Sequence, residues 1–116
     1  MTIQDVITNI DNIKPNQYDE GTKLDWINQI ENKVYQMMKL RKGSEDIKKP
    51  HITIESDYDE TLLIPDTYSD IYMHYLSAKI DYYNGETKRY NNSMIMFNSS
   101  WGEFENYWYR QHPQIQ

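Results

Sequence analysis

The chain has 116 residues, enough for one domain with a modest hydrophobic core. It contains no Cys, which excludes disulfides and thiolate-bound metals, and its formal net charge of −6 argues against a protein that wraps nucleic acid through the phosphates. No apolar run approaches the length that spans a bilayer, and the N-terminus lacks the pattern of a secretory signal. We therefore expect a protein of the cytosol that makes no contact with membranes.

The first predicted helix covers residues 2–13. Apolar residues recur there at every third or fourth position, which is the spacing of one buried helix face: Ile3, Val6, Ile7, Ile10 and Ile13. Thr2 can cap the start, and Asp5 lies in the positively polarised first turn. Pro15 ends the helix, because the residue before a proline is driven away from helical dihedral angles.

A second helix is predicted over residues 20–41. Its buried face contains Leu24, Ile27, Ile30 (or Glu31), Val34, Met37 and Met38. Lys39, Arg41 and Lys42 lie near its C-terminal end, where positive charge is favoured, and Gly43 is a stop signal.

The periodicity changes in residues 50–64. Two short runs, residues 51–54 and 61–64, resemble β-strands and are separated by a polar turn. The sequence is compatible with a small β-hairpin or with an extended segment that leans on the helices, because two strands alone are marginally stable in water. The acids Asp57, Asp59 and Glu60 in the turn are candidate loop or channel-facing residues.

The last part of the chain contains one long seam of apolar and aromatic residues at alternating three- and four-residue steps. Its members are Met73, Leu76, Ile80, Tyr83, Thr87, Tyr90, Met94, Phe97, Trp101, Phe104 and Trp108. A single helix from Tyr68 to Tyr109 would be about 60 Å long. Because Asn84 and Gly85 both tolerate the left-handed conformation that ends helices, we favour two helices, at 67–83 and 87–109, over one kinked helix.

These elements predict an all-α fold of about four helices. We expect a single helical domain at residues 1–109, followed by a flexible, polar C-terminal tail at 110–116.

The aromatic composition indicates a contact surface. The chain contains eleven Tyr and three Trp. Because a buried Tyr needs a hydrogen-bond partner for its hydroxyl, these residues suit a subunit contact that is partly buried and partly exposed to solvent. Each ring can equally cover the domain's own core. Asn beside a packing seam fixes register when it is buried, or simply faces water. The candidate interface residues are Tyr83, Tyr90, Asn91, Asn92, Phe97, Asn98, Trp101 and Trp108.

No pattern in the sequence points to catalysis, a metal or a cofactor. Asp57 and Asp59 have the first spacing of a calcium loop, but Leu62 stands where that loop needs glycine and Tyr68 where it needs a bidentate Glu. The three His residues are scattered over separate segments, and no glycine-rich phosphate loop is present. We expect a protein without enzymatic activity; an enzyme that uses the acidic loop and His51 is the weakest alternative.

Three stretches carry a family resemblance: PDTYSDIY at 65–72, IDYYNGE at 80–86, and RYNNSM with FNSSW between 89 and 101. Together with a weaker likeness in residues 3–35, they make the chain resemble head–tail connector (head-completion, adaptor) proteins of tailed bacteriophages and of prophages in Gram-positive bacteria.

The resemblance implies an α-helical structural protein of the virion neck, assembled in the bacterial cytoplasm. It implies that copies form a ring under the phage portal protein, extend the DNA channel without sequence-specific DNA binding, and receive the next neck or tail-completion protein. The alternative is a small helical protein that binds and regulates a host or phage partner through its aromatic surface.

Overall fold

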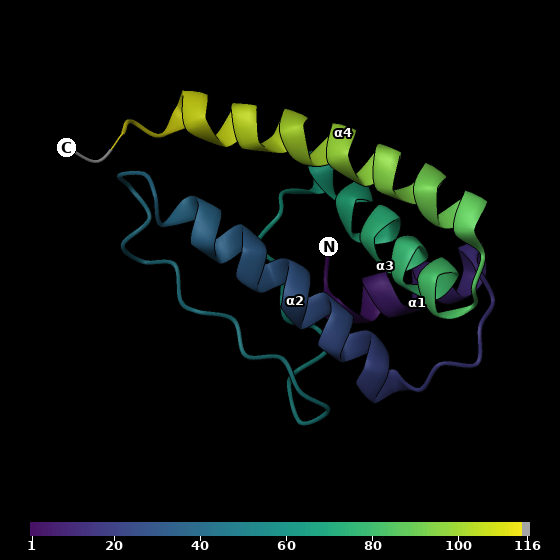
Figure 1. Cartoon of the computed structure of the whole chain (residues 1–116). Coiled ribbons are helices and arrows are strands. Elements are labelled where there is room, and N and C mark those ends of the chain that lie inside the picture. Colours follow the sequence, from purple (N-terminus) through teal and green to yellow (C-terminus); the bar gives the residue numbers. More distant parts are fainter. Residues whose placement is uncertain (115–116) are drawn as a thin grey trace.

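The computed structural model describes residues 1–114, and the prediction of an all-α fold is confirmed (Figure 1). The helices are α1 (Ile3–Ile13), α2 (Glu20–Met38), the 3-10 helix η1 (Asp66–Tyr68), α3 (Asp70–Tyr83) and α4 (Thr87–Gln111). Helices α3 and α4 form an antiparallel hairpin, and α1 and α2 pack on α3. The molecule measures 45 × 33 × 20 Å, and α4 runs along much of the longest dimension.

The first two helices begin at the side-chain caps that the sequence offers. In α1, the Thr2 hydroxyl accepts a hydrogen bond from the Asp5 N–H, and the Asp5 carboxylate accepts one from the Thr2 N–H at 3.0 Å. This reciprocal pair is a capping box, which satisfies two N–H groups that a helix leaves unpaired. In α2, Asp19 accepts a hydrogen bond from the Thr22 N–H at 2.7 Å.

Helix α2 ends at Met38, earlier than the predicted end at Arg41. The N–H groups of Leu40 and Arg41 bond to carbonyls only three residues back, so the chain tightens into a turn. The buried Ser44 hydroxyl then donates to the Arg41 carbonyl at 2.8 Å. Gly43, the predicted stop, lies in this turn with a φ of 86°.

Of the two alternatives for residues 50–64, the structure has the extended segment and not the β-hairpin. Among residues 1–114, the two β-like runs are not paired with each other. Their backbone N–H groups bind elsewhere: Ile52 donates to the Asn28 side chain at 3.0 Å, and Leu63 donates to Glu31 at 2.9 Å. Because helix α2 supplies the acceptors that a partner strand would have supplied, the segment lies along α2 as an ordered loop.

The seam of aromatic residues is split between two helices at Asn84 and Gly85. Gly85 has a φ of 73°, its N–H donates to the Tyr82 carbonyl, and the Glu86 N–H donates to the Asp81 carbonyl. This pair of hydrogen bonds is the Schellman motif, in which a glycine in the left-handed region closes a helix. The two-helix prediction is therefore correct, and the kinked single helix is excluded.

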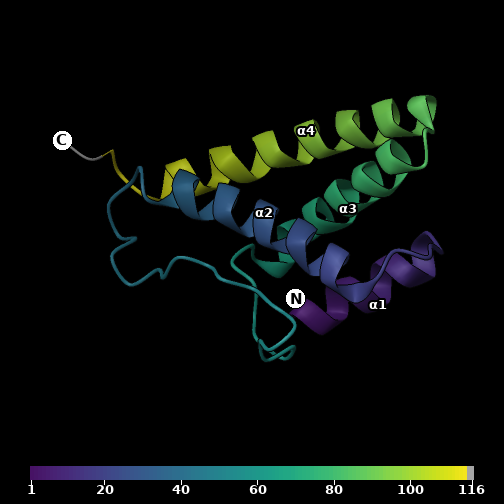
Figure 2. The ribbon, with the colours of Figure 1, turned by 60° about the horizontal axis from the view of Figure 1, so that its bottom comes forward.

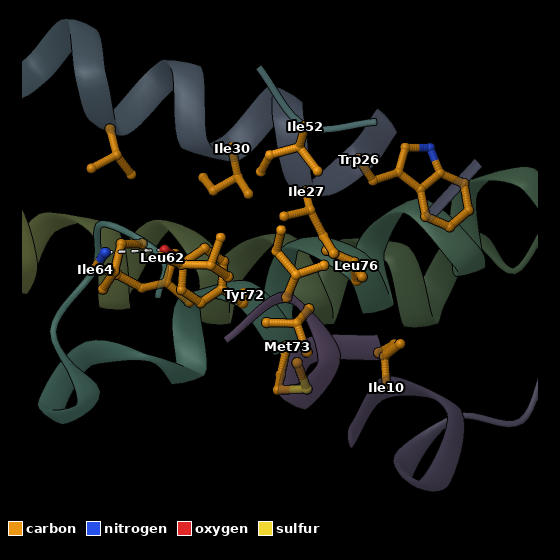
Figure 3. Packing of buried hydrophobic residues seen from close by; sticks show 14 of the residues in the cluster. Ile10, Trp26, Ile27, Ile30, Ile52, Leu62, Ile64, Tyr72, Met73 and Leu76 are labelled. Carbon is orange, nitrogen blue, oxygen red and sulfur yellow. Dashed lines mark hydrogen bonds between the residues drawn. The ribbon is translucent and has the colours of Figure 1, made fainter. Parts of the chain in front are cut away.

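The core lies where α1, α2, α3 and the loop before η1 meet (Figure 3). Figure 3 shows side chains of all four segments pointing toward one another, among them Ile10, Ile27, Ile52, Leu62 and Leu76. Helix α4 covers α3 from outside and buries two rings completely or nearly so, Phe97 and Phe104.

The C-terminal segment contacts the turn after α2. Helix α4 continues two residues past the predicted Tyr109, the His112 ring stacks on Trp108 with centroids 3.5 Å apart, and the Lys42 N–H donates to the Pro113 carbonyl. The predicted tail at 110–116 thus begins inside a helix. Ile115 and Gln116 lie outside the described residues, and the flexibility of the tail stays a prediction.

Candidate functional site

The predicted interface residues lie on α4, except Tyr83 at the end of α3, and they range from buried to exposed. Phe97 is buried, with its ring 5.4 Å from that of Tyr75, and it belongs to the chain's own core. Trp101 and Trp108 are half-buried: Trp101 packs edge-on against Phe104, and Trp108 packs on His112. These rings leave only part of their surface to a partner, because the apolar seam mainly joins α4 to the rest of the molecule.

Tyr83 and Tyr90 lie near the α3–α4 turn. The Tyr83 ring stacks on Trp26 with centroids 5.9 Å apart, yet 58% of the residue is exposed. Tyr90 is half-buried and packs against Tyr82, whose exposed fraction is 61%. Unlike the buried seam residues, these tyrosines offer apolar area and free hydroxyl groups to solvent.

Asn91, Asn92 and Asn98 are all exposed, as the solvent-facing interpretation predicts. Beside them, Ile95 and Met96 are also exposed, by 65% and 52%. Neither residue is among the predicted interface residues, although an apolar side chain outside the seam is a sequence signal for such a surface. Two adjacent large apolar side chains on the outer face of α4 are unusual enough to mark a candidate contact surface.

A groove opens between the two helices of the hairpin. It has a volume of about 340 Å³ and is lined by Tyr75, Ala78, Lys79, Tyr82, Tyr83, Tyr90 and Met94. The lining is aromatic and apolar, with four phenol groups and one ammonium group. We call this feature the tyrosine groove.

The corner beside the tyrosine groove is fixed by a buried carboxylate. Asp81 of α3 is 2.5 Å from the Lys14 ammonium and accepts a hydrogen bond from Ser93 of α4 at 3.2 Å. The Tyr18 hydroxyl donates to Asn84 at 2.6 Å. These contacts join the segment after α1 to the α3–α4 turn, next to Tyr82 and Tyr83 of the groove.

The predicted acids Asp57, Asp59 and Glu60 are all exposed in the loop after α2. The Asp57 carboxylate accepts a hydrogen bond from the Asp59 N–H at 2.9 Å, which fixes the turn. Ile54, just before them, is 68% exposed. We call residues 53–60 the acidic loop. It lies on the side of α2 opposite to α4, as both ribbon views show (Figures 1 and 2).

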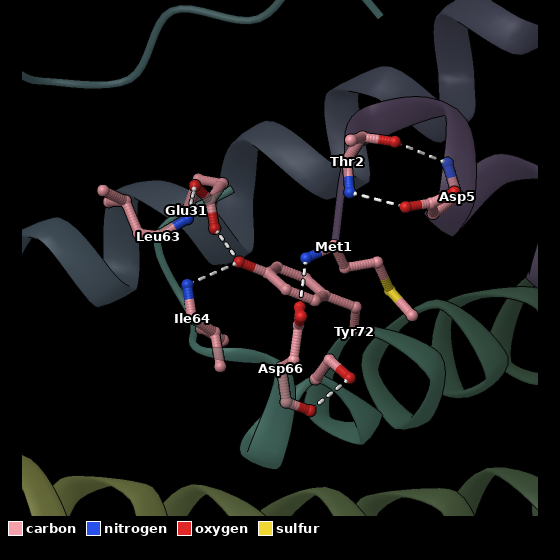
Figure 4. Close-up of polar contacts among 9 residues, drawn as sticks. Met1, Thr2, Asp5, Glu31, Leu63, Ile64, Asp66 and Tyr72 are labelled. Atoms are coloured by element: carbon pink, nitrogen blue, oxygen red, sulfur yellow. Dashed lines mark hydrogen bonds and ion pairs between the residues drawn. The ribbon is translucent and has the colours of Figure 1, made fainter. Parts of the chain in front are cut away.

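A carboxyl group with a strongly raised pKa lies in the core rather than on either surface. Glu31 is 2% exposed, receives hydrogen bonds from the Tyr72 hydroxyl and the Leu63 N–H, and has its pKa raised to about 7, chiefly by burial (Figure 4). Burial, followed by the charge of Glu31, raises the pKa of Tyr72 well above its usual range. Both groups are enclosed, and their contacts explain their placement as a structural pair.

Among residues 1–114, no three His, Asp or Glu side chains gather in a geometry that can hold a metal ion. Over the same range, none of the helices has both the length and the apolarity needed to cross a bilayer. Comparisons with protein-family models, with curated proteins and with solved structures give no match.

Proposed function

We propose that this chain is a structural subunit of the neck of a tailed bacteriophage or prophage particle. In this role, copies join into a ring beneath the portal protein, extend the DNA channel and present a docking site for the next neck or tail-completion protein. The resemblance of residues 65–108 to head–tail connector proteins suggests this role, and the all-α fold agrees with it.

The observation that carries the proposal is the apolar surface of the α3–α4 hairpin. Tyr82, Tyr83, Ile95 and Met96 are each more than half exposed, although the domain has its own core. A soluble chain that leaves so much apolar area on one helical hairpin gains free energy by covering it with another protein surface. A subunit inside a particle has such neighbours on several sides.

The charge of the chain supports passage of DNA without adhesion. The net charge of −6 repels phosphates, and binding of nucleic acid through its backbone needs clustered Lys and Arg. A neck channel has to let DNA leave the head quickly, so a surface that does not bind DNA suits it.

Quantitative mass spectrometry of gradient-purified phage particles tests the proposal. We expect the chain in the particle in a fixed ratio to the portal protein, and density for a helical ring between portal and tail in electron cryomicroscopy. A chain that is missing from complete particles and binds one non-virion protein would instead support the regulatory alternative.

Paired variants locate the contact surface. We expect Ile95→Ser with Met96→Ser to fold normally and to enter particles poorly, because the change removes exposed apolar area without touching the core. Glu103→Ser, at an exposed position of the same helix, is the matched control and should enter particles normally.

A further inference from the structure

We propose that the acidic loop of one copy docks in the tyrosine groove of the next copy, so that identical subunits join head to tail. This inference rests on the proposed function in one respect, the association of copies, and names the two surfaces that meet. It assigns the loop acids to the subunit contact instead of the channel.

The groove offers apolar walls with hydrogen-bond donors and positive charge at its rim. Tyr82 and Tyr83 expose both ring area and hydroxyl groups, and Lys79 is part of the lining. The Lys79 ammonium lies 5.4 Å from the Tyr75 ring centroid, and Glu86 is an exposed acid in the turn between α3 and α4. Such a site suits a ligand that has one apolar side chain and several carboxylates around it.

The acidic loop has this composition. Ile54 is the most exposed large apolar residue of the chain among residues 1–114, and acids follow it directly: Glu55, Asp57, Asp59 and Glu60, all exposed. No Lys or Arg lies between Glu55 and Asp70. One isoleucine would enter the groove, while carboxylates meet the phenol hydroxyls and the Lys79 ammonium.

The loop is also held in shape before it meets a partner. The Thr53 N–H donates to the Ser56 hydroxyl at 2.9 Å, and the Ser56 N–H returns a bond to the Thr53 carbonyl. The Tyr58 hydroxyl donates to Glu20 at 2.9 Å, and the Gln4 N–H donates to the Tyr58 carbonyl, so α2 and α1 hold the loop. A loop that is already ordered loses little conformational entropy on docking.

The placement of the two surfaces excludes their meeting within one copy. The acidic loop lies on one side of the molecule and the α3–α4 hairpin on the other, with α2 between them (Figures 1 and 2). A contact between two different patches of identical subunits is heterologous, and it generates a closed ring when the rotation between neighbours closes. The two patches thus form a heterologous pair, the type of contact from which rings and open filaments are both built.

Charge reversal on each surface separately, then in combination, tests the contact. We expect the groove variant, Lys79→Glu, and the loop variant, Glu55→Lys with Asp59→Lys, each to associate more than about tenfold more weakly than the wild type, because like charges then face each other. An equimolar mixture of the two variants should associate again, since each reversed surface then finds an opposite charge on the other variant. Sedimentation velocity at low ionic strength measures all three samples.

Two further variants test the apolar part of the contact and its specificity. Ile54→Ser should weaken association without changing the melting temperature, whereas Leu40→Ser, at a similarly exposed site away from both surfaces, should leave association unchanged. Asp57 is kept in every variant, because its carboxylate holds the loop turn.

The outcomes separate this inference from the proposed function. A wild type that stays monomeric at millimolar concentration, or variants that fold and associate like the wild type, would overturn the loop-in-groove contact. Neither result bears on whether the chain is part of the phage particle. The mass spectrometry of purified particles tests that separately. Conversely, the mixed variants could associate again while the chain is absent from particles. That pair of results would support the loop-in-groove contact and refute the neck role.

Discussion

The Tyr72 hydroxyl donates a hydrogen bond to the Glu31 carboxylate and accepts one from the Ile64 N–H at 3.0 Å (Figure 4). One phenol group therefore joins α3, α2 and the loop that precedes η1. The second Glu31 oxygen accepts a hydrogen bond from the Leu63 N–H. The N–H groups of two consecutive loop residues are therefore both bonded to the Tyr72–Glu31 pair. A buried network is favourable only while every member keeps its partner.

Glu31 should make the stability of the protein depend on pH. Its folded pKa of about 7 lies above the ordinary value of 4.5, so between these values the native state binds more protons than the unfolded state. The free energy of unfolding should therefore fall as pH rises through this window, by roughly 3 kcal/mol. Urea denaturation of the wild type and of Glu31→Gln at pH 5 and pH 7.5 measures the effect.

The glutamine variant supplies the control for that slope, because it does not titrate. Its free energy of unfolding should change much less between the two pH values. Hydrogen bonds at the helix starts lower the pKa values of Asp5 and Asp19. These two groups therefore change the free energy of unfolding only in more acidic solution. Equal slopes for both proteins would show that Glu31 keeps its ordinary pKa.

Tyr72→Phe should destabilise the fold by about 1–3 kcal/mol, because it leaves the Ile64 N–H and one Glu31 oxygen buried without this partner. Tyr82→Phe is the matched control, since the Tyr82 ring is mostly exposed. Its unfolding free energy should match that of the wild type. Chemical denaturation of the three proteins at one pH checks the difference.

The two glycines of the hairpin should respond in opposite directions. Gly85→Ala should lose about 1 kcal/mol, because alanine is strained at a φ of 73°. Gly102→Ala should gain up to about 1 kcal/mol, because Gly102 lies inside α4 and an added methyl group meets open space. Thermal melts monitored by circular dichroism report both changes, and a loss at Gly102 would contradict the open space around the added methyl group.

Phe97→Ala should destabilise the fold by about 3–5 kcal/mol, because it empties a buried site beside Tyr75. Trp101→Ala should cost less, since its ring is half-buried and one face lies under the Lys33 ammonium, 4.9 Å from the ring centroid. Equal losses for both variants would place Trp101 in the core as well. Calorimetry of the folded monomers separates these cases.

The helices were predictable because their apolar spacing and caps are local signals. Thr2 and Asp5 at the start of α1, and Asn84 with Gly85 at the end of α3, specify their boundaries within a few residues. The choice between a hairpin and an extended segment at 50–64 could not be made from local signals. Residues 51–54 and 61–64 alternate as strand residues do, but the backbone N–H groups of Ile52 and Ile64 bond to the side chains of Asn28 in α2 and Tyr72 in α3. No local pattern predicts these partners.

The surface was harder to predict than the fold. A seam of aromatic residues has the same spacing whether it faces the chain's own core or another molecule, so Phe97 and Tyr83 looked alike in the sequence although one is buried and the other exposed. Glu31 was visible as an alternative to Ile30 on the buried face of α2, and the structure buries both. Only the three-dimensional contacts reveal that a carboxylate can occupy that position because Tyr72 and Leu63 solvate it.

The long loop between α2 and η1 has a consequence for how the molecule breaks down. An irregular stretch of this length is normally the first place that a protease cuts. Here the backbone N–H groups of the loop bond to the side chains of Asn28, Glu31 and Tyr72. The loop therefore cannot detach unless the helices that carry those side chains separate too. We expect loop and helices to open together in one cooperative event, and the chain to resist limited digestion across residues 50–64 until it melts as a whole.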